Sequence, residues 1–474
     1  MIARWLVPTA AVVLGSACSF APHYARPVTQ PPPATYQEES GWKQAQPADE
    51  DRRGPWWESY GDPQLDALEN RVTVSNQNLA AAFARLQQAR AQTRIERSYQ
   101  FPTVTAGPRA LRERESLNAP TFSPGKPATA NDFTLNADIS YEFDVWGRIR
   151  NLVAAARASE QASVADLATL DLSLHAELAS DYFTLRGEDT QQELLDRTAT
   201  DYQGALDLTQ SLFDGGAAAE ADLDQAKAQV QTALTQAADN RLRRAQTEHA
   251  LAVLLGELPS TYRLDPRPLE PAVMPPPIAP GLPSQLLERR PDVAAAERRV
   301  ASANAQIGVA RAAYFPVFSL AGLVGFESSS ASNLLSAPSR VWSVGPQGVL
   351  TVFDGGLHRA QSAQAHAAYD EQVANYRSAV LTAYQDVEDN IAALRQLEQE
   401  GVTQAAAVAA TTRALEQAQA RYAGGIVTYL EVVVAENAAL SARLSAADIQ
   451  IRRMVASVQL VKALGGGWTL SGTD

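Results

Sequence analysis

The segment Arg421-Tyr422-Ala423-Gly424-Gly425 repeats, in altered form, Leu212-Phe213-Asp214-Gly215-Gly216, which lies about 210 residues earlier in the chain. Two further pairs of segments have nearly the same separation: FDVWG (143–147) with FDGGL (353–357), and RIERSYQFP (94–102) with VARAAYFP (309–316). One such pair can arise by chance in an alanine-rich chain. Three pairs in the same order indicate that the chain is an internal duplication.

Composition excludes several functions. The chain has 474 residues and a formal net charge of −13, which disfavours nucleic acid as a partner because phosphate binding needs a basic face. It has one cysteine and five scattered histidines, without the Cys/His spacing of a metal site. It contains neither a glycine-rich phosphate loop nor a serine-centred nucleophile motif. We therefore predict that it is not an enzyme and has no cofactor and no metal.

The N-terminus is typical of an exported protein. Residues 1–17 have a basic start, an apolar core and a run of small residues, which predicts a signal peptide. Cys18 follows directly, as in bacterial lipoproteins whose cysteine is lipidated, and Ser19 offers no acidic retention signal, so the outer membrane is the expected address. Ordinary cleavage after Ala17, which leaves a free thiol, is the alternative. Residues 18–55 are rich in proline and predict a lipid-anchored, extended arm.

Helix and strand patterns alternate after the arm. Apolar spacing predicts a helix over 62–98, and no later stretch has the roughly 20 apolar residues of a membrane-spanning helix. Residues 133–143 alternate apolar and polar side chains, which suits a transmembrane strand, although a half-buried sandwich strand has the same pattern. Further strands are expected at 104–114, 317–327 and 342–353. Because four strands cannot close a membrane barrel, a membrane location would require oligomerisation.

Two long stretches without proline, 128–258 and 347–474, are free to form long helices. Each contains one glycine pair, where a helix-to-helix turn is expected, and residues 147–213 predict a single 67-residue helix. Between the halves, residues 259–283 hold nine prolines and predict an extended connector. The predicted organisation is a first repeat over 56–258, the connector over 259–283, a second repeat over 284–468 and a tail over 469–474.

Several segments of the sequence are distinctive when they occur together and in this order: CSFAPHYARP (18–27), WW (56–57), DPQL (62–65), NQNL (76–79), RRPDVAAAE (289–297), AYFP (313–316), FDGG (353–356) and RYAGG (421–425). These segments and the order of the predicted elements resemble the TolC-like outer-membrane factors, especially the lipoprotein branch that serves tripartite (RND-type) efflux systems. The resemblance covers nearly the whole mature chain.

This resemblance implies a mainly α-helical chain with β-β-α-α units, whose four strands join those of two other copies in a 12-stranded outer-membrane β-barrel. A long periplasmic α-helical barrel would continue it. The implied function is the exit duct of a tripartite efflux pump, which passively conducts small toxic compounds or drugs. The implied partners are two further copies in a homotrimer, a periplasmic adaptor, an inner-membrane RND-type pump and outer-membrane lipid. The outer-membrane component of a type I polypeptide secretion system and a periplasmic coiled-coil scaffold are the alternatives.

The resemblance also assigns a periplasmic gate near the glycine turns. Tyr422 occupies the position of a gating tyrosine, and Asp222 that of a carboxylate that partners the inner helix. Glu431 corresponds to one acidic ring of the constriction, whereas Val427 and Val434 replace a basic and an acidic residue, so closure could be partly hydrophobic. Without the resemblance, the two carboxylates would be interpreted as solvated helix surface.

The turns themselves are the expected docking site for the adaptor, because small residues let another backbone approach closely. The candidates are Gly215, Gly216, Gly424, Gly425 and Ile426. A purely structural role in forming the turns is the alternative, and both roles can coexist.

Overall fold

The computed structural model describes residues 19–29, 54–118, 120, 125, 128–270, 274–276 and 289–466. The predicted signal peptide and Cys18 lie outside these residues. The chain forms two compact units, each drawn from both halves of the sequence. The strand unit comprises Met1–Val28, Arg85–Val164 and Ala295–Arg377, and the helical unit comprises Thr29–Ala84, Ala165–Ala294 and Ser378–Asp474.

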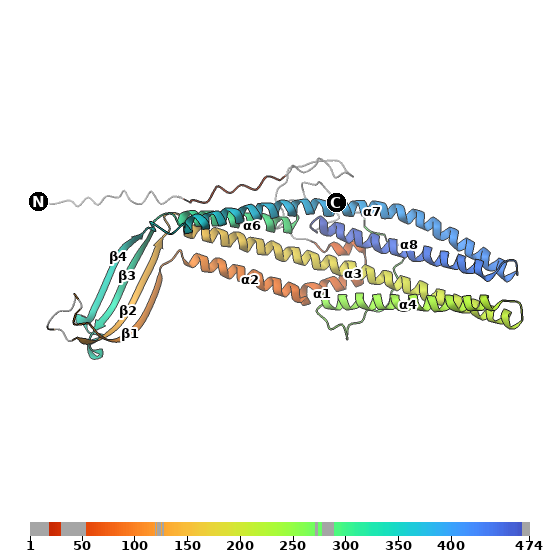
Figure 1. Cartoon of the computed structure of the whole chain (residues 1–474), viewed down its shortest axis with the longest axis horizontal. Helices are drawn as coiled ribbons and strands as arrows, with labels where there is room; N and C mark the ends of the chain where they lie inside the picture. The colour runs from red at the N-terminus through yellow and green to blue at the C-terminus, as the bar shows by residue number, and fades with distance from the viewer. Residues whose placement is uncertain are drawn as a thin grey trace. The chain divides into compact units, whose positions relative to one another are not determined.

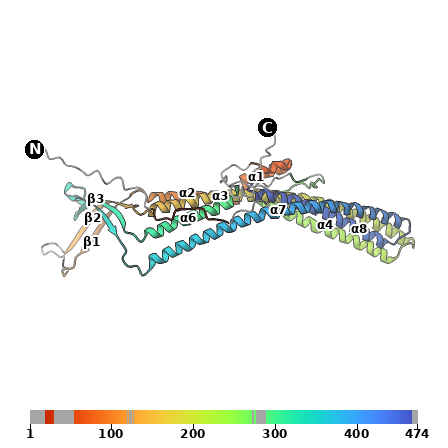
Figure 2. The ribbon, with the colours of Figure 1, turned by 90° about the horizontal axis from the view of Figure 1, so that it is seen from above.

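The strand unit contains one antiparallel sheet in the order β1-β2-β3-β4, whose strands lie side by side in both views (Figures 1 and 2). The strands are β1 (Thr103–Arg114), β2 (Thr129–Phe143), β3 (Val317–Ser328) and β4 (Arg340–Val349). Two short 3-10 turns, Ala331–Asn333 and Ala337–Ser339, connect β3 to β4. The prediction of a strand as far as residue 353 was wrong. Because β3 begins at Val317, directly after Pro316, its partner Val349 is the last residue that β4 can pair.

The strand register gives this sheet two chemically different faces. Cross-strand partners in an antiparallel sheet lie on the same face, so the pairing assigns every side chain to one of them. Over most of the strand length, one face is apolar across all four strands: Val104, Ala106, Pro108, Ala110, Phe133, Leu135, Ala137, Ile139, Tyr141, Phe143, Phe318, Leu320, Gly322, Val324, Phe326, Trp342, Val344, Pro346 and Gly348. At one end of the strands the same face carries polar residues, Arg112, Arg114, Thr129, Asn131, Ser328 and Arg340. Trp342 and Val344 on this face are 74% and 63% exposed. The predicted alternation of residues 133–143 is thus one column of a larger apolar surface.

The N-terminal segment 19–29 lies along the helices that adjoin the sheet. The ring of Phe20 stacks on Phe315, with 4.4 Å between the ring centroids and 4° between the planes, and also contacts Trp146. The Trp146 Nε1–H donates to the carbonyl of Pro316 over 2.7 Å. Asn304 donates to the carbonyl of Pro22 over 2.9 Å. The start of the described chain is therefore fixed beside the ends of β2 and β3.

The helices repeat in length as well as in order. The first series is α2 (Gln77–Ser98), α3 (Arg148–Asp214) and α4 (Glu220–Leu254), and the second is α6 (Pro291–Ala312), α7 (Leu357–Ala423) and α8 (Tyr429–Ala463). The members of the three pairs have 22, 67 and 35 residues. This agreement confirms the duplicated helix, strand, strand, long helix, long helix order.

The helix predicted over 62–98 is broken in two by Asn76, which has an extended backbone between α1 (Pro63–Ser75) and α2. The Asn76 side chain accepts the backbone N–H groups of Asn78 and Leu79 over 2.9 and 3.1 Å, and donates to the carbonyl of Leu254 over 2.8 Å. It therefore caps α2 and ties it to the end of α4, because short polar side chains stabilise helix starts in this way.

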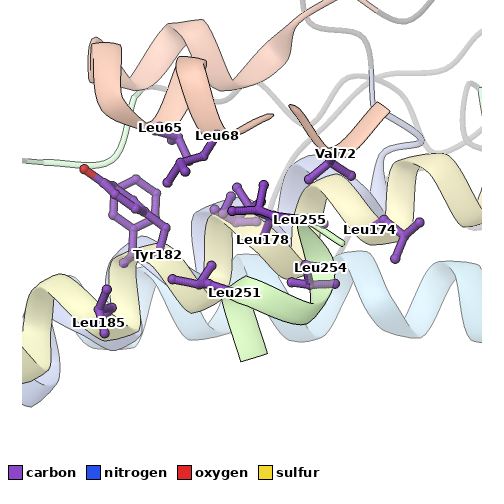
Figure 3. Close-up of a cluster of buried hydrophobic side chains, with 14 of the residues drawn as sticks. Leu65, Leu68, Val72, Leu174, Leu178, Tyr182, Leu185, Leu251, Leu254 and Leu255 are labelled. Atoms are coloured by element: carbon purple, nitrogen blue, oxygen red, sulfur yellow. The ribbon is translucent and has the colours of Figure 1, made fainter. Parts of the chain in front are cut away.

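The main core of the helical unit lies where α1 packs against α3 and α4 (Figure 3). Its labelled members are Leu65, Leu68, Val72, Leu174, Leu178, Tyr182, Leu185, Leu251, Leu254 and Leu255. The hydroxyl of Tyr182 donates to Asp62 over 2.7 Å, and Asp62 also caps α1 by accepting the N–H of Gln64 over 3.0 Å. The short first helix is thus held by both apolar packing and a buried polar contact.

A buried histidine adds a polar contact beside this core. The Nδ1 of His175 lies 2.5 Å from the carboxylate of Glu69, and its ring stacks on Trp57 with a centroid separation of 4.5 Å. Burial opposes the charge on His175, but contacts with Asp171 and Glu69 outweigh it and raise its pKa to about 9. Burial raises the pKa of Glu69 to about 7, against the influence of His175.

None of the helices in the described part of the chain combines the length and the apolar composition needed to cross a membrane.

Candidate functional site

The two glycine turns of the helical unit have the same backbone geometry. At the α3–α4 turn, Ala217 donates to the carbonyl of Leu212 over 2.7 Å, and Gly216 adopts a φ of 76°. At the α7–α8 turn, Ile426 donates to the carbonyl of Arg421 over 2.9 Å, and Gly425 adopts a φ of 69°. Both are Schellman turns, which require a left-handed residue that glycine adopts without steric cost.

All four long helices meet next to these turns (Figure 1). The shared feature is a layer of small and aromatic side chains at the ends of the helices, which we call the tip cluster. Its buried members are Ala226, Ala418, Tyr429, Val432 and Val433, and Ala205, Leu206, Tyr422 and Ala435 pack against them. The two hairpins of one chain are therefore packed together at the tip, and opening it would expose this layer.

Tyr422 is half-buried in the tip cluster. Its ring lies 5.4 Å from the ring of Tyr429, at an angle of 55°, and its hydroxyl is 3.4 Å from the hydroxyl of Thr209. Thr209 belongs to α3, Tyr422 to α7 and Tyr429 to α8. The tyrosine that the resemblance assigned to the gate thus joins the two hairpins of this chain.

Glu431 forms an ion pair with Arg421 across the α7–α8 turn. Both side chains are about half exposed, so water screens the pair and its stabilising effect is small. The position of Glu431 in the first turn of α8 also suits a carboxylate, because the helix dipole is positive there. The sequence predicted Glu431 as part of an acidic ring and gave no role to Arg421. The positive charge of Arg421 compensates the negative charge of Glu431.

Asp222, Val427 and Val434 have different surroundings. Asp222 is half-buried at the third position of α4, where its carboxylate accepts the N–H of Ala219 over 3.4 Å and caps the helix. Val427 is half-buried in the α7–α8 turn, and Val434 is exposed on α8. The structure therefore places all five gate candidates near the turns, but brings only Tyr422 into the contact between hairpins.

The surface over the turns is open. A Cβ atom built on Gly216 or Gly425 would meet no other atom within 4 Å, and one on Gly215 or Gly424 would approach mainly the carbonyls of its own helix. Ile426 projects beside them with 71% of its surface exposed. The turns thus present bare backbone and one apolar side chain to an approaching partner.

Glu436 was missed by the sequence analysis. It lies on α8, close to the tip cluster, and only 4% of its surface is exposed. Its Oε2 atom is buried without a hydrogen-bond partner among the described residues. Burial, with a smaller contribution from Asp201, raises its pKa to about 7, although a hydrogen bond from Gln419 opposes the shift. A single glutamate in an amphipathic helix gives no sequence signal of such burial.

Across the residues that the structure describes, no group of three or more histidine, cysteine, aspartate or glutamate side chains is arranged to hold a metal ion. The features that the described residues show at the tip are packing, ion pairing and backbone access.

The chain is similar in sequence and in structure to outer-membrane proteins. The outer membrane protein OprJ of Pseudomonas aeruginosa is 33% identical over 459 residues, which cover 97% of this chain and 94% of OprJ. The cation efflux system protein CusC of Escherichia coli K12 is 29% identical over 465 residues, which cover 98% of this chain and 99% of CusC. The solved structure of the outer-membrane channel OprN superposes with a TM-score of 0.85 at 31% identity, over 95% of this chain and all of that one.

The fold is therefore that of the TolC-like outer-membrane channels: mainly helical, with a small antiparallel sheet. A family model described as "Outer membrane efflux protein" matches residues 68–257 and 282–466, which together form most of the sequence. This chain belongs to the outer membrane efflux protein family.

Proposed function

We propose that three copies of this chain form the exit duct of a tripartite efflux pump. The duct conducts small toxic compounds passively from an inner-membrane RND-type pump and a periplasmic adaptor to the outside of the cell. The sheet of each copy lies in the outer membrane, and the long helices extend into the periplasm. The chain supplies a path and a gate, while the pump supplies the energy.

The exposed apolar face of the sheet is the observation that carries this proposal. Apolar side chains cover the whole width of the sheet on one face, and Trp342 and Val344 are largely exposed. Such a surface is unfavourable in water, whereas lipid accepts it. Trp342 also suits a membrane interface, where aromatic side chains are enriched in transmembrane barrels.

The edges of the sheet require further copies of the chain. Among the described strands, β1 and β4 each pair on one side only. An unpaired strand edge is not tolerated in lipid, because its N–H and C=O groups would lack hydrogen-bond partners. Pairing β1 of one copy with β4 of the next removes all edges, and three four-stranded sheets then form a barrel of about 12 strands, within the range of known membrane barrels.

The opposite face of the sheet suits the lining of a water-filled pore. It is mainly polar and includes the charged side chains Arg109, Glu113, Asp138, Glu142 and Glu327. In membrane barrels of this size, polar side chains point inward and lipid-facing ones outward. The alternation in residues 133–143 thus directs polar side chains toward the proposed pore and apolar side chains toward lipid.

A lipid on Cys18 would attach each copy to the same membrane. Cys18 is only two residues from Phe20, which stacks on Phe315 beside the end of β3. In cells fed radioactive palmitate, a Cys18→Ser variant should lose the label, whereas retained label would exclude Cys18 as the site.

We propose that the gate is at the helix tips. Closure there combines the contact of Tyr422 with Tyr429 and Thr209, the Arg421–Glu431 pair and the exposed apolar Val434. Asp222 supports the gate by capping α4, and Val427 contributes apolar packing at the turn. Closure therefore depends more on packing than on ion pairs, since the pairs Arg421–Glu431 and Lys227–Asp224 at the tip are about half exposed or more.

The adaptor docks on the glycine turns formed by Gly215, Gly216, Gly424, Gly425 and Ile426. Two turns of identical geometry, with open space above the glycines, offer matched sites to repeated elements of a partner. Exposed Ile426 supplies an apolar contact.

Conductance of the purified protein in planar lipid bilayers tests the duct directly. We expect channels whose conductance rises when Tyr422→Ala loosens the tip. Protein that inserts but never conducts, even with this substitution, would refute the proposal. Channels without export of small toxic compounds in cells would instead favour polypeptide secretion.

A further inference from the structure

The tip contains a buried carboxyl group that the gate described above does not use. Glu436 is on α8, one turn beyond Val432 and Val433 of the tip cluster, and it is 4% exposed. A fully buried carboxylate is costly unless it is paired, because its charge loses the solvation of water. Its Oε2 atom has no hydrogen-bond partner in the described part of the chain.

Groups from three helices surround Glu436. The titratable and polar groups that influence it are Asp201 and Tyr202 on α3, Gln419 on α7 and Tyr429 on α8. None of them is a cation. The hydroxyls of Tyr202 and Tyr429 are also buried and have no hydrogen-bond partner among the residues that the structure describes. From α4 this region receives apolar side chains, including Val230 and Ala233, which pack with Tyr202.

These surroundings favour the neutral form of Glu436. As a carboxylate it would face the negative charge of Asp201 and two phenol rings, with Gln419 as its hydrogen-bond donor. As a carboxylic acid it is neutral and gains a donor of its own. Separation of α3, α7 and α8 would expose the group to water, where it ionises readily above its ordinary pKa.

We propose that Glu436 is a proton-operated lock of the tip, which is neutral while the hairpins are packed and ionised once they separate. The lock rests on the proposed gate at the helix turns and specifies what regulates it. Protons bind the packed tip more tightly than the separated one, so acid stabilises the packed tip and alkali favours its opening. Because the tip faces the periplasm in this proposal, external pH would control the lock.

The direction and the size of the pH effect on tip opening follow from the difference between the pKa of Glu436 in the packed tip and in the separated tip. Burial and Asp201 raise the pKa of Glu436 in the packed tip to about 7, whereas the ordinary value is 4.5. The proton on Glu436 stabilises the packed tip fully below pH 4.5, and this stabilisation is lost as the pH rises to about 7. The opening equilibrium of each chain then increases by about 70-fold between pH 5 and pH 8.5.

Hydrogen exchange of the full-length protein measures this opening without requiring a channel. After correction for the intrinsic effect of pH, we expect protection of the amides in 199–230 and 418–436 to fall by about 70-fold from pH 5 to pH 8.5. Glu436→Gln keeps the shape of the side chain but cannot ionise, so its protection should stay high and flat. Glu436→Met, which removes the carboxyl altogether, should also give a flat profile.

Glu416→Gln is the matched control, because Glu416 is exposed on α7 and is not part of the proposed gate. It should retain the pH-dependent loss of protection seen in the wild type. A flat wild-type profile, or an unchanged loss of protection in Glu436→Gln, would overturn the lock. A protein that shows the expected profile but no conductance would leave the lock intact and refute the duct.

Discussion

Substitution of lysine at two adjacent residues of β4 should have opposite outcomes if one face of the sheet contacts lipid. Val344 lies near the middle of β4, pairs with Gly322 and belongs to the apolar face. Ser343 pairs with Leu323 and belongs to the opposite face. Val344→Lys therefore places a charge toward the hydrocarbon, whereas Ser343→Lys places the same charge toward the proposed pore. Neither substitution removes a backbone hydrogen bond of the strand.

The size of the effect follows from the depth of the residue. A lysine on the lipid face of a membrane barrel costs about 2–4 kcal/mol near the bilayer midplane. This is a loss of about 30- to 700-fold in the folding equilibrium per chain, because 1.4 kcal/mol corresponds to a factor of ten. The exposed fraction of Val344, 63%, shows that no other part of the described strand unit shields the position.

The assay is folding of urea-denatured protein into phosphatidylcholine vesicles, followed by titration with urea. Val344→Lys should lower the free energy of unfolding by about 2–4 kcal/mol per chain. Ser343→Lys should leave it within about 0.5 kcal/mol of the wild type, as for most surface substitutions. Equal losses from both variants, or no loss from Val344→Lys, would refute the assignment of the apolar face to lipid.

Three further predictions concern the helical unit. Because Arg421 neutralises Glu431, Arg421→Ala should increase the cation selectivity of the channel and Glu431→Ala should decrease it. Reversal potentials in planar bilayers measure this selectivity. Reversal potentials that neither substitution changes would show that the pair does not line the pore. The His175→Gln variant should melt below the wild type in detergent at pH 6, and the difference should shrink as the pH rises through about 9, because the raised pKa of His175 stabilises the fold only while the ring is protonated. A difference independent of pH would show that the ring is not charged. At the α7–α8 turn, Gly425→Ala should destabilise the tip by about 1 kcal/mol and Gly424→Ala by less, because Gly425 has a left-handed backbone and Gly424 does not. Hydrogen exchange of the turn measures both effects. Equal effects would show that the left-handed backbone of Gly425 does not determine the loss of stability.

The regular parts of this fold could be predicted from sequence because they depend on local signals. The helix predicted over 147–213 is observed as α3 (Arg148–Asp214), since the chain contains no proline there and ends the helix at a glycine pair. The break at Asn76 was not predicted, because the residue caps α2 only in combination with the carbonyl of Leu254, which is distant in the sequence. The end of β4 was set by its partner strand and was likewise invisible locally.

The site was predicted less completely than the fold. The glycine turns were predicted from a repeated motif and Tyr422 from the family resemblance, and in the structure they lie close together in the helical unit. The Arg421–Glu431 pair was missed because the two residues are on different helices, joined by the turn. Glu436 was missed because only the packing of α3, α7 and α8 around it makes a glutamate there unusual.

Cross-linking between the edge strands tests most directly whether three copies close one barrel. Cysteine at Thr105 in β1 is combined with cysteine at Val341, Ser343 or Gly345 in β4, all on the polar face of the sheet. Each single substitution, with Cys18 retained, serves as the control. We expect at least one pair to give covalent trimers on oxidation in native membranes, while the single variants remain monomeric. Membrane-inserted protein that yields no product larger than a dimer, for any pair, would contradict the trimeric duct.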